Sequence, residues 1–327
     1  MPPTPDPAGL GETLAALPVL VEDVACDVGS VTVPAFGGAR PTSVVTLRGR
    51  RTAGRGENIA WTEAAQHHFA MHARVAPRGG WCLGDWSAAM REVIAEPYER
   101  AALEAAALDL ALRQARTSLF QLAMVKPTPV RYVVSFGKVA DPVGEAQRHG
   151  DAELKVDVAP EWSDETYRAL AALERVAILD FKWAGEHADH ERAHRLLPKA
   201  LIEDPLPSFE GWSPSLAAQL SFDAPLTAAR ELATLPTRPA FVNLKPARMG
   251  GVLEAVACAE RCAAEGIGVY VGGMFEIGVG RAQLRTLAAV LSPDGPNDIA
   301  PIARGNDQPA RPPRLAVSAA WGFGDSV

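Results

Sequence analysis

The sequence has no run of about 18 apolar residues, the shortest stretch that crosses a membrane as a helix. Its N-terminus lacks the basic region and the apolar core of a signal peptide. Lys and Arg do not cluster, and 32 basic against 39 acidic residues give a net charge of −7, which disfavours nucleic-acid binding. We therefore expect a cytoplasmic protein that acts on a small molecule, without a nucleic-acid or membrane partner.

Cysteine is scarce, and the four present, Cys26, Cys82, Cys258 and Cys262, do not have the spacing of a zinc site. We expect all four to be reduced thiols. The chain of 327 residues, 48% of them hydrophobic, is long enough for one barrel-sized domain and a smaller second domain.

Strand-like apolar runs that end in a charged residue recur in the C-terminal part of the chain. The run at 241–244 ends in Lys245, and three upstream runs end in Asp180, Glu203 and Asp223. A further run carries Lys155. These residues follow one another at intervals of about 20–25 residues, the length of a strand followed by a helix. Parallel strands of this kind close most simply into a barrel, whose functional residues gather at the carboxyl ends of the strands.

The N-terminal part has a different pattern. It carries strand-like runs at 19–33 and 43–48, a predicted turn at 54–58, and helical patterns at 62–76, 86–95 and 97–117.

We therefore expect an α/β fold, a modified TIM (β/α) barrel with an N-terminal α+β capping domain. The predicted boundaries are a flexible leader at 1–12, the cap at 13–125, the barrel at 126–303, and a C-terminal tail at 304–327 that packs on the cap. A weak eighth strand is expected near 298–301.

Three carboxylates at one barrel rim repel one another unless a cation neutralises them. Oxygen ligands without histidine or cysteine favour Mg²⁺, with Mn²⁺ as the alternative. Such an ion could hold a substrate carboxylate and stabilise the enediolate that forms when the neighbouring carbon loses a proton. We predict Asp180, Glu203 and Asp223 as ligands and Lys245 as the base, because metal charge and burial both favour the neutral amine. The alternative is that these acids are solvated loop residues.

Five segments carry a resemblance to a known family: 98–113, 202–205, 222–223, 242–251 and 271–281. They resemble the enolase superfamily in its muconate-lactonizing subgroup, and most of all o-succinylbenzoate synthases and N-acylamino acid racemases. The similarity spans about residues 20–325. It implies a capped barrel with Mg²⁺ at the three acids and Lys245 beside the substrate. It also implies that cap segments matching 32–42 and 54–58 close over the substrate.

The sequence departs from this family at three strand ends. Family members usually carry Lys-x-Lys on the second strand, and the second lysine, the opposing base, corresponds here to Asp157. Their Asp-x-Asn on the third strand is Asp180-Phe-Lys182 in this chain. Their Asp-Glu on the fifth strand is Asp223-Ala224.

The first two departures are coupled in our interpretation. Neighbouring strands lie ~5 Å apart, so the positive charge lost at Asp157 would reappear at Lys182, and we hypothesise an ion pair between the two. Lys182 could then be a relocated base or cation facing Lys245, a structural partner of Asp157, or an ammonium that displaces the metal. A two-residue shift in the alignment would instead place Lys155 at the base position.

Our leading hypothesis is a Mg²⁺-dependent lyase that removes a proton α to a carboxylate, as in the o-succinylbenzoate synthase step of menaquinone biosynthesis. Lys245 would act with Lys155 or Lys182. One alternative is a racemase, epimerase or cycloisomerase of another carboxylic acid. Another is a barrel without catalysis, suggested by Asp157, Lys182 and Ala224. The expected partner is a small carboxylate, and a homo-oligomer is compatible with either activity.

Overall fold

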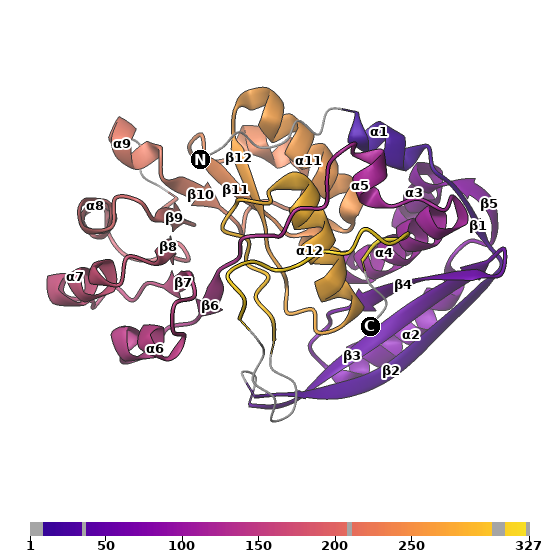
Figure 1. The fold of residues 1–327 in the computed structure, drawn as a ribbon, viewed down its shortest axis with the longest axis horizontal. Helices are drawn as coiled ribbons and strands as arrows, with labels where there is room; N and C mark the ends of the chain where they lie inside the picture. The colour runs from indigo at the N-terminus through magenta and orange to yellow at the C-terminus, as the bar shows by residue number, and fades with distance from the viewer. Residues whose placement is uncertain (1–8, 35–36, 208–210, 303–310, 325–327) are drawn as a thin grey trace.

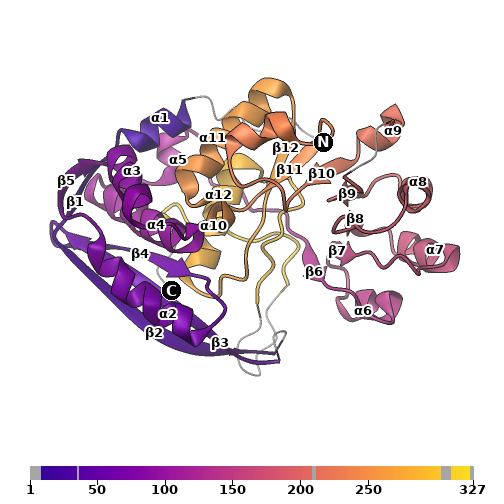
Figure 2. The same ribbon diagram turned by 180° about the vertical axis from the view of Figure 1, so that it is seen from behind.

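The computed structural model describes residues 9–34, 37–207, 211–302 and 311–324. Figures 1 and 2 show a sheet-and-helix cap formed by the N-terminal part, beside a curled array of strands with helices on its outside. Among the described residues, no helix is long and apolar enough to cross a membrane. The four cysteines are free.

The cap is an antiparallel sheet of β2, β3 and β4 covered by helices, with β1 paired to β5. Its elements are α1 (Leu10–Ala15), β1 (Pro18–Val21), β2 (Asp23–Val33), β3 (Gly38–Gly49), β4 (Thr52–Asn58), α2 (Glu63–His72), the 3₁₀ helix η2 (Ala73–Val75), β5 (Gly79–Cys82), α3 (Leu83–Val93), α4 (Pro97–Gln114) and α5 (Leu119–Leu122).

The segment 54–58 belongs to strand β4, so the predicted turn there is wrong. Its glycines serve packing instead: a Cβ on Gly54 would lie 2.2 Å from the backbone nitrogen of Leu110, and one on Gly56 would lie 1.9 Å from the carbonyl oxygen of Ala102. Only glycine therefore lets this strand approach the alanine-rich helix α4 so closely.

The predicted leader is wrong for residues 10–12, because α1 begins at Leu10. Leu10 and Leu14 are buried in the core. Residues 1–8 of the predicted leader lie outside the described residues.

The C-terminal domain is a seven-stranded parallel sheet in the order β6 to β12, with each strand beside the next along the chain. Its elements are β6 (Val134–Phe136), α6 (Pro142–Arg148), β7 (Leu154–Asp157), α7 (Asp164–Ala172), β8 (Val176–Asp180), α8 (His187–Leu196), β9 (Leu201–Glu203), α9 (Pro214–Ala217), β10 (Leu220–Phe222), the 3₁₀ helix η3 (Ala229–Thr234), β11 (Phe241–Leu244), α10 (Pro246–Met249), α11 (Val252–Glu265), β12 (Gly268–Val271) and α12 (Val279–Leu291).

A short segment at 297–298 closes this sheet. Asn297 forms a parallel bridge with Tyr132, and Asp298 forms one with Gly272 beyond the end of β12. The amide of Asp298 donates to the carbonyl of Val271 at 2.9 Å. The expected eighth strand is thus reduced to two bridges, and the predicted modified TIM barrel with an N-terminal cap is confirmed.

The described part of the C-terminal tail contacts α4. The amide of Phe323 donates to Asp109 Oδ1 at 2.8 Å, and that of Gly322 donates to the carbonyl of Thr117 at 2.9 Å. Residues 303–310 and 325–327 of the predicted tail lie outside the described residues.

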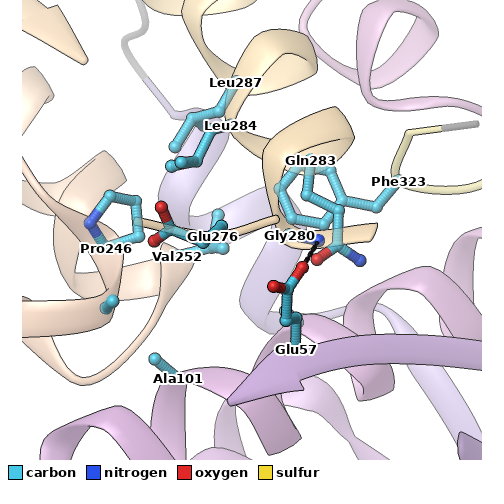
Figure 3. Close-up of a pocket in the computed structure, with 12 residues that line it drawn as sticks. Glu57, Ala101, Pro246, Val252, Glu276, Gly280, Gln283, Leu284, Leu287 and Phe323 are labelled. Atoms are coloured by element: carbon cyan, nitrogen blue, oxygen red, sulfur yellow. Dashed lines mark hydrogen bonds between the residues drawn. The ribbon is translucent and has the colours of Figure 1, made fainter. Parts of the chain in front are cut away.

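Glu57 of β4 joins the cap to the barrel. Its carboxylate accepts hydrogen bonds from the amides of Ile277, Gly278 and Gly280, at 2.6, 2.7 and 2.9 Å. Figure 3 shows Glu57 reaching Gly280 beside a small cavity of about 40 Å³ between α4 and α12. The first amides of a helix have no partner within the helix, so this buried carboxylate caps α12 from the other domain.

We predict that Glu57→Ala lowers the free energy of unfolding by about 3 kcal/mol, because it leaves three amides without an acceptor at the domain junction. Urea unfolding of the full chain measures this loss. Glu63→Ala, which truncates an exposed glutamate, is the control and should change the free energy of unfolding little. Equal effects of the two substitutions would show that Glu57 does not hold the domains together.

Candidate active site

The charged residues predicted at strand ends do lie at one rim of the barrel. Asp157, Asp180 and Glu203 end three adjacent strands, and they are paired in register across β7, β8 and β9. Asp223 and Lys245 directly follow β10 and β11. The rim surrounds a cavity of about 220 Å³. Its charged lining includes Lys155, Lys182, Lys245, Asp157, Asp223 and Asp298.

Lys155 is buried and contacts three carboxylates. Its ammonium contacts Glu203 Oε2 and lies 3.3 Å from Asp180 Oδ2 and 3.6 Å from Asp298 Oδ2. Burial opposes the charge of Lys155, but Glu203, Asp298 and Asp180 together raise its pKa well above the usual lysine value. Lys155 is therefore a permanent cation at neutral pH.

The predicted ion pair between Asp157 and Lys182 is present, with Lys182 Nζ 3.2 Å from Asp157 Oδ1. The same ammonium donates to Asp180 Oδ2 at 2.7 Å. Burial disfavours its charge, but Asp180 and Asp157 raise the pKa of Lys182 above the ordinary value. Two ammonium groups thus contact Asp180, the last residue of β8. One belongs to Lys182, two residues further along the chain, and the other to Lys155 of β7.

Lys245 and Arg248 share one carboxylate. Lys245 Nζ donates to Asp223 Oδ2 at 2.7 Å, and Arg248 donates to Asp223 Oδ1 at 2.7 Å and to its carbonyl at 2.8 Å. Burial alone would raise the pKa of Asp223, but Lys245, Lys155 and Arg248 hold it at about 2. Asp223 is therefore ionised at any physiological pH.

Glu203 is the most enclosed of the acids. Its Oε1 accepts from Asn243 Nδ2 at 2.9 Å and from the Tyr270 hydroxyl at 3.0 Å, and its Oε2 contacts the Lys155 ammonium. Burial raises the pKa of Glu203 to about 7, although Lys155 acts in the opposite direction. Sequence reasoning did not identify Asn243 or Tyr270, because each looks like an ordinary strand residue.

Two further acids at the rim were missed. Asp204 accepts hydrogen bonds from the amides of Asp223 and Ala224, at 2.8 and 3.2 Å, and so positions the loop after β10. Burial raises the pKa of Asp204 to about 6, and the neighbouring Asp223 acts in the same direction. Asp298 comes from the closing segment, whose apolar pattern is too short to mark a strand end.

Strained backbone also concentrates at this rim. Lys182, Trp183, Asp204 and Phe275 all have positive φ, at 48°, 61°, 43° and 71°. Residues other than glycine rarely adopt this conformation, and it persists where the surroundings over-determine it, as they often do at functional sites. Phe275 also lines the cavity.

The arrangement of the three predicted ligands, as it stands, does not fit a Mg²⁺ ion. Asp180, Glu203 and Asp223 do not converge: within the described ranges, the one group of acids, histidines or cysteines whose ligand atoms all lie within 4.8 Å of one another is His68, His72 and Glu99. An ion bonded to Asp180 Oδ2 at ~2.1 Å would lie no farther than about 5 Å from either ammonium group, because Lys155 and Lys182 are 3.3 and 2.7 Å from that oxygen. Each would repel it by roughly 7 kcal/mol at an effective dielectric constant near 20. Metal ligation by these acids remains a prediction.

Known proteins resemble this chain both in sequence and in fold. An N-succinylamino acid racemase of Amycolatopsis sp is 33% identical over 218 residues, 61% of this chain and 59% of that protein. One from Thermus thermophilus is 29% identical over 66% of this chain and 64% of that protein. An o-succinylbenzoate synthase of Geobacillus kaustophilus is 29% identical over 56% of this chain and 53% of that protein. The matches thus span less than two thirds of these relatives.

Solved structures show the same fold at low sequence identity. A dipeptide epimerase of Methylococcus capsulatus, complexed with Mg and the dipeptide L-Arg-D-Lys, has a TM-score of 0.78 and 20% identity, covering 93% of this chain and 99% of that one. An enolase-superfamily member of Listeria innocua has a TM-score of 0.77 and 20% identity, covering 94% and 95%.

The protein therefore has the capped-barrel fold of the enolase superfamily, and its sequence relatives are racemases and synthases of that superfamily. More particularly, the chain belongs to the family described as "Domain of unknown function (DUF8230)". Its N-terminal domain matches residues 12–122 and its C-terminal domain matches residues 126–305.

Glu276 holds the loop between β12 and α12, which contributes Gly273 and Phe275 to the lysine-lined cavity. Its Oε2 accepts from the amide of Met274 at 2.8 Å. Burial raises the pKa of Glu276, and Glu57 adds to this rise while Arg281 opposes it. The folded protein therefore binds this proton more tightly than the unfolded chain does.

We predict that Glu276 makes the protein less stable as the pH rises. Its stabilising contribution is complete below the ordinary glutamate pKa of about 4.3 and is lost as the pH passes through the raised value. Urea unfolding between about pH 4 and pH 8 should show a decline that Glu276→Gln reduces. The exposed Glu161, changed to Gln, is the control. An undiminished decline in Glu276→Gln would contradict the assignment.

Proposed function

We propose that the rim cavity binds a small carboxylate substrate and that the protein removes the proton from the carbon α to that carboxylate. The observation that carries this proposal is the convergence of three lysine ammonium groups, from Lys155, Lys182 and Lys245, on one cavity at the carboxyl ends of parallel strands. The names of the sequence relatives, racemases and o-succinylbenzoate synthases, support this class of chemistry.

Lys155 and Lys182 are the groups suited to binding charge. Both are held in the protonated form by neighbouring carboxylates. An enediolate formed from the substrate carboxylate would carry its developing negative charge beside them. Preorganised donors of this kind contribute roughly 10²–10³ in rate each. In this proposal, the two ammonium groups supply the positive charge that Mg²⁺ at the predicted metal site would otherwise supply.

Lys245 is the proposed base. To accept a proton it must first lose its own, which would leave Asp223 without that partner. Arg248 remains on the other oxygen of Asp223, so the carboxylate keeps a cation when Lys245 is neutral. Asp223 therefore has a cationic partner in either protonation state of Lys245.

The specific reaction we propose is an o-succinylbenzoate synthase-like dehydration. Lys245 would take the α-proton and then deliver it to the leaving hydroxyl group, so that water departs and a carbon–carbon double bond forms. This sequence needs an acid and base on one face of the substrate. Racemisation needs one on each face, and the second position is occupied by Asp157, paired with Lys182.

The Asp157–Lys182 ion pair also favours a second candidate, a barrel that binds carboxylates without turning them over. The pair engages two of the three residues, the third being Lys155, that could serve on the face opposite Lys245. Ala224, where family members usually carry a glutamate, removes a further polar group from the rim. Binding without proton exchange would distinguish this candidate from the enzyme.

We predict that the protein exchanges the α-proton of a suitable substrate for deuterium and that Lys245→Ala lowers the rate by at least about 100-fold. Proton NMR in deuterated buffer measures exchange and elimination together, using N-succinylamino acids, dipeptides and 2-succinyl-cyclohexadiene carboxylates. Lys199→Ala, at an exposed lysine, is the control and should keep full activity. Equal rates in both variants would refute the role of Lys245, and binding without exchange would support the second candidate.

We also predict that Mg²⁺ raises the melting temperature of wild type little and that of Lys182→Asn more. The substitution removes one ammonium from Asp180, so an ion that binds the native state can then stabilise it by mass action. Thermal melts with and without millimolar Mg²⁺, on protein first treated with a chelator, make the measurement. A large Mg²⁺ shift in wild type would instead support the predicted metal site at Asp180, Glu203 and Asp223.

A further inference from the structure

Two histidines and a glutamate form a cluster on the cap, separate from the lysine-lined cavity. His68 and His72 lie one turn apart on α2, and Glu99 lies in the first turn of α4. His68 Nδ1 is 3.2 Å from Glu99 Oε1, and His72 Nδ1 is 2.9 Å from Glu99 Oε2. The centres of the two imidazole rings are 3.9 Å apart.

The burial of these three side chains is uneven. The Glu99 side chain is 5% exposed, whereas those of His68 and His72 are 61% and 41% exposed. A buried carboxylate is costly without a compensating cation. In the parts of the chain that the structure describes, the ion-pairing contacts of Glu99 are these two histidines, which carry charge only when protonated.

The spacing of the ligand atoms matches a small metal ion. A tetrahedral Zn²⁺ site has bonds of ~2.0–2.1 Å to nitrogen and oxygen, which place neighbouring ligand atoms about 3.3 Å apart. The two nitrogen–oxygen distances here are within 0.4 Å of that value, and one ligand atom from each residue lies within 4.8 Å of the other two. The two contacts use different oxygens of Glu99, so side-chain rotation would bring both imidazoles and the carboxylate to one ion.

We propose that His68, His72 and Glu99 bind a divalent transition-metal ion of the Zn²⁺ type. Two imidazoles and one carboxylate form a donor set that proteins use for Zn²⁺, and nitrogen ligands select such ions over Mg²⁺. The exposure of the two histidines leaves the fourth coordination position open to water. The ion would supply the positive charge that the buried carboxylate of Glu99 requires.

The ion would fasten the end of α2 to the start of α4. Helix α2 packs on β2 and β3, whereas α4 packs on β3 and β4, so the site bridges the two helices that cover the cap sheet. Binding to the native state should therefore stabilise the cap and raise the melting temperature. The proposal is independent of the chemistry at the barrel rim.

Titration of the chelator-treated full chain with Co²⁺ tests the site, because the visible absorption of Co²⁺ reports nitrogen ligands and low coordination number. We expect one equivalent of Co²⁺ to bind, Zn²⁺ to displace it, and Zn²⁺ to raise the melting temperature. His68→Gln and His72→Gln should each weaken Co²⁺ binding more than about tenfold, since loss of even an outer-shell partner can cause such a decrease.

His67→Gln is the matched control, because His67 lies on the same helix but contacts Glu63 at 3.6 Å. It should bind Co²⁺ as wild type does. Asp180→Asn should also retain binding, which separates this site from the rim acids. Circular dichroism checks that each variant is folded. If His72→Gln does not fold, the test rests on His68→Gln, because the His68 side chain is more exposed. Absence of Co²⁺ binding in wild type, or equal binding in His67→Gln, His68→Gln and His72→Gln, would overturn the proposal.

Discussion

Charge balance among the strand-end carboxylates is the constraint on which the barrel rim depends. Six acids, Asp157, Asp180, Glu203, Asp204, Asp223 and Asp298, lie at the rim, most of them buried, and charges in such a place must be compensated. Lys155, Lys182, Lys245 and Arg248 provide the compensation through direct contacts. These pairs link residues of β7 to β11 and the closing segment, and the positive φ values of Lys182 and Asp204 mark where the rim backbone is constrained.

The rim differs from the expected superfamily pattern at two neighbouring positions, Asp157 at the end of β7 and Lys182 just after β8. In the alignment proposed from the sequence, Asp157 corresponds to the family's second base and Lys182 to its asparagine. The ion pair at 3.2 Å shows that the two departures compensate each other locally. The positive charge of Lys182 also lies against Asp180, at 2.7 Å. Asp157 without Lys182 would be a buried carboxylate that has lost its ion-pair partner, whereas Lys182 also contacts Asp180, so the dependence runs from Asp157 to Lys182.

The sequence was sufficient to predict the features that depend on local periodicity. Regular spacing of apolar runs, each ending in a charged residue, predicted the parallel barrel and the gathering of Asp180, Glu203, Asp223 and Lys245 at one rim. The Asp157–Lys182 pair followed from strand adjacency. The roles of Glu57 and Asp298 could not be predicted, because each depends on contacts between segments more than 100 residues apart. Gly54 and Gly56 suggested a turn because the close approach of α4 is invisible in the sequence.

The described residues that line the cavity all belong to the barrel, but one of them rests against the cap. Phe275, from the loop after β12, lines the cavity and meets Trp61 of the cap with ring centres 5.0 Å apart. The Arg40 guanidinium also lies over the Trp61 ring, 4.0 Å from its centre, and so helps to hold that indole. Glu57 fixes the start of the following helix. One wall of the cavity, the Phe275 ring, is therefore positioned by a cap residue, so the place of that wall depends on how the two domains pack.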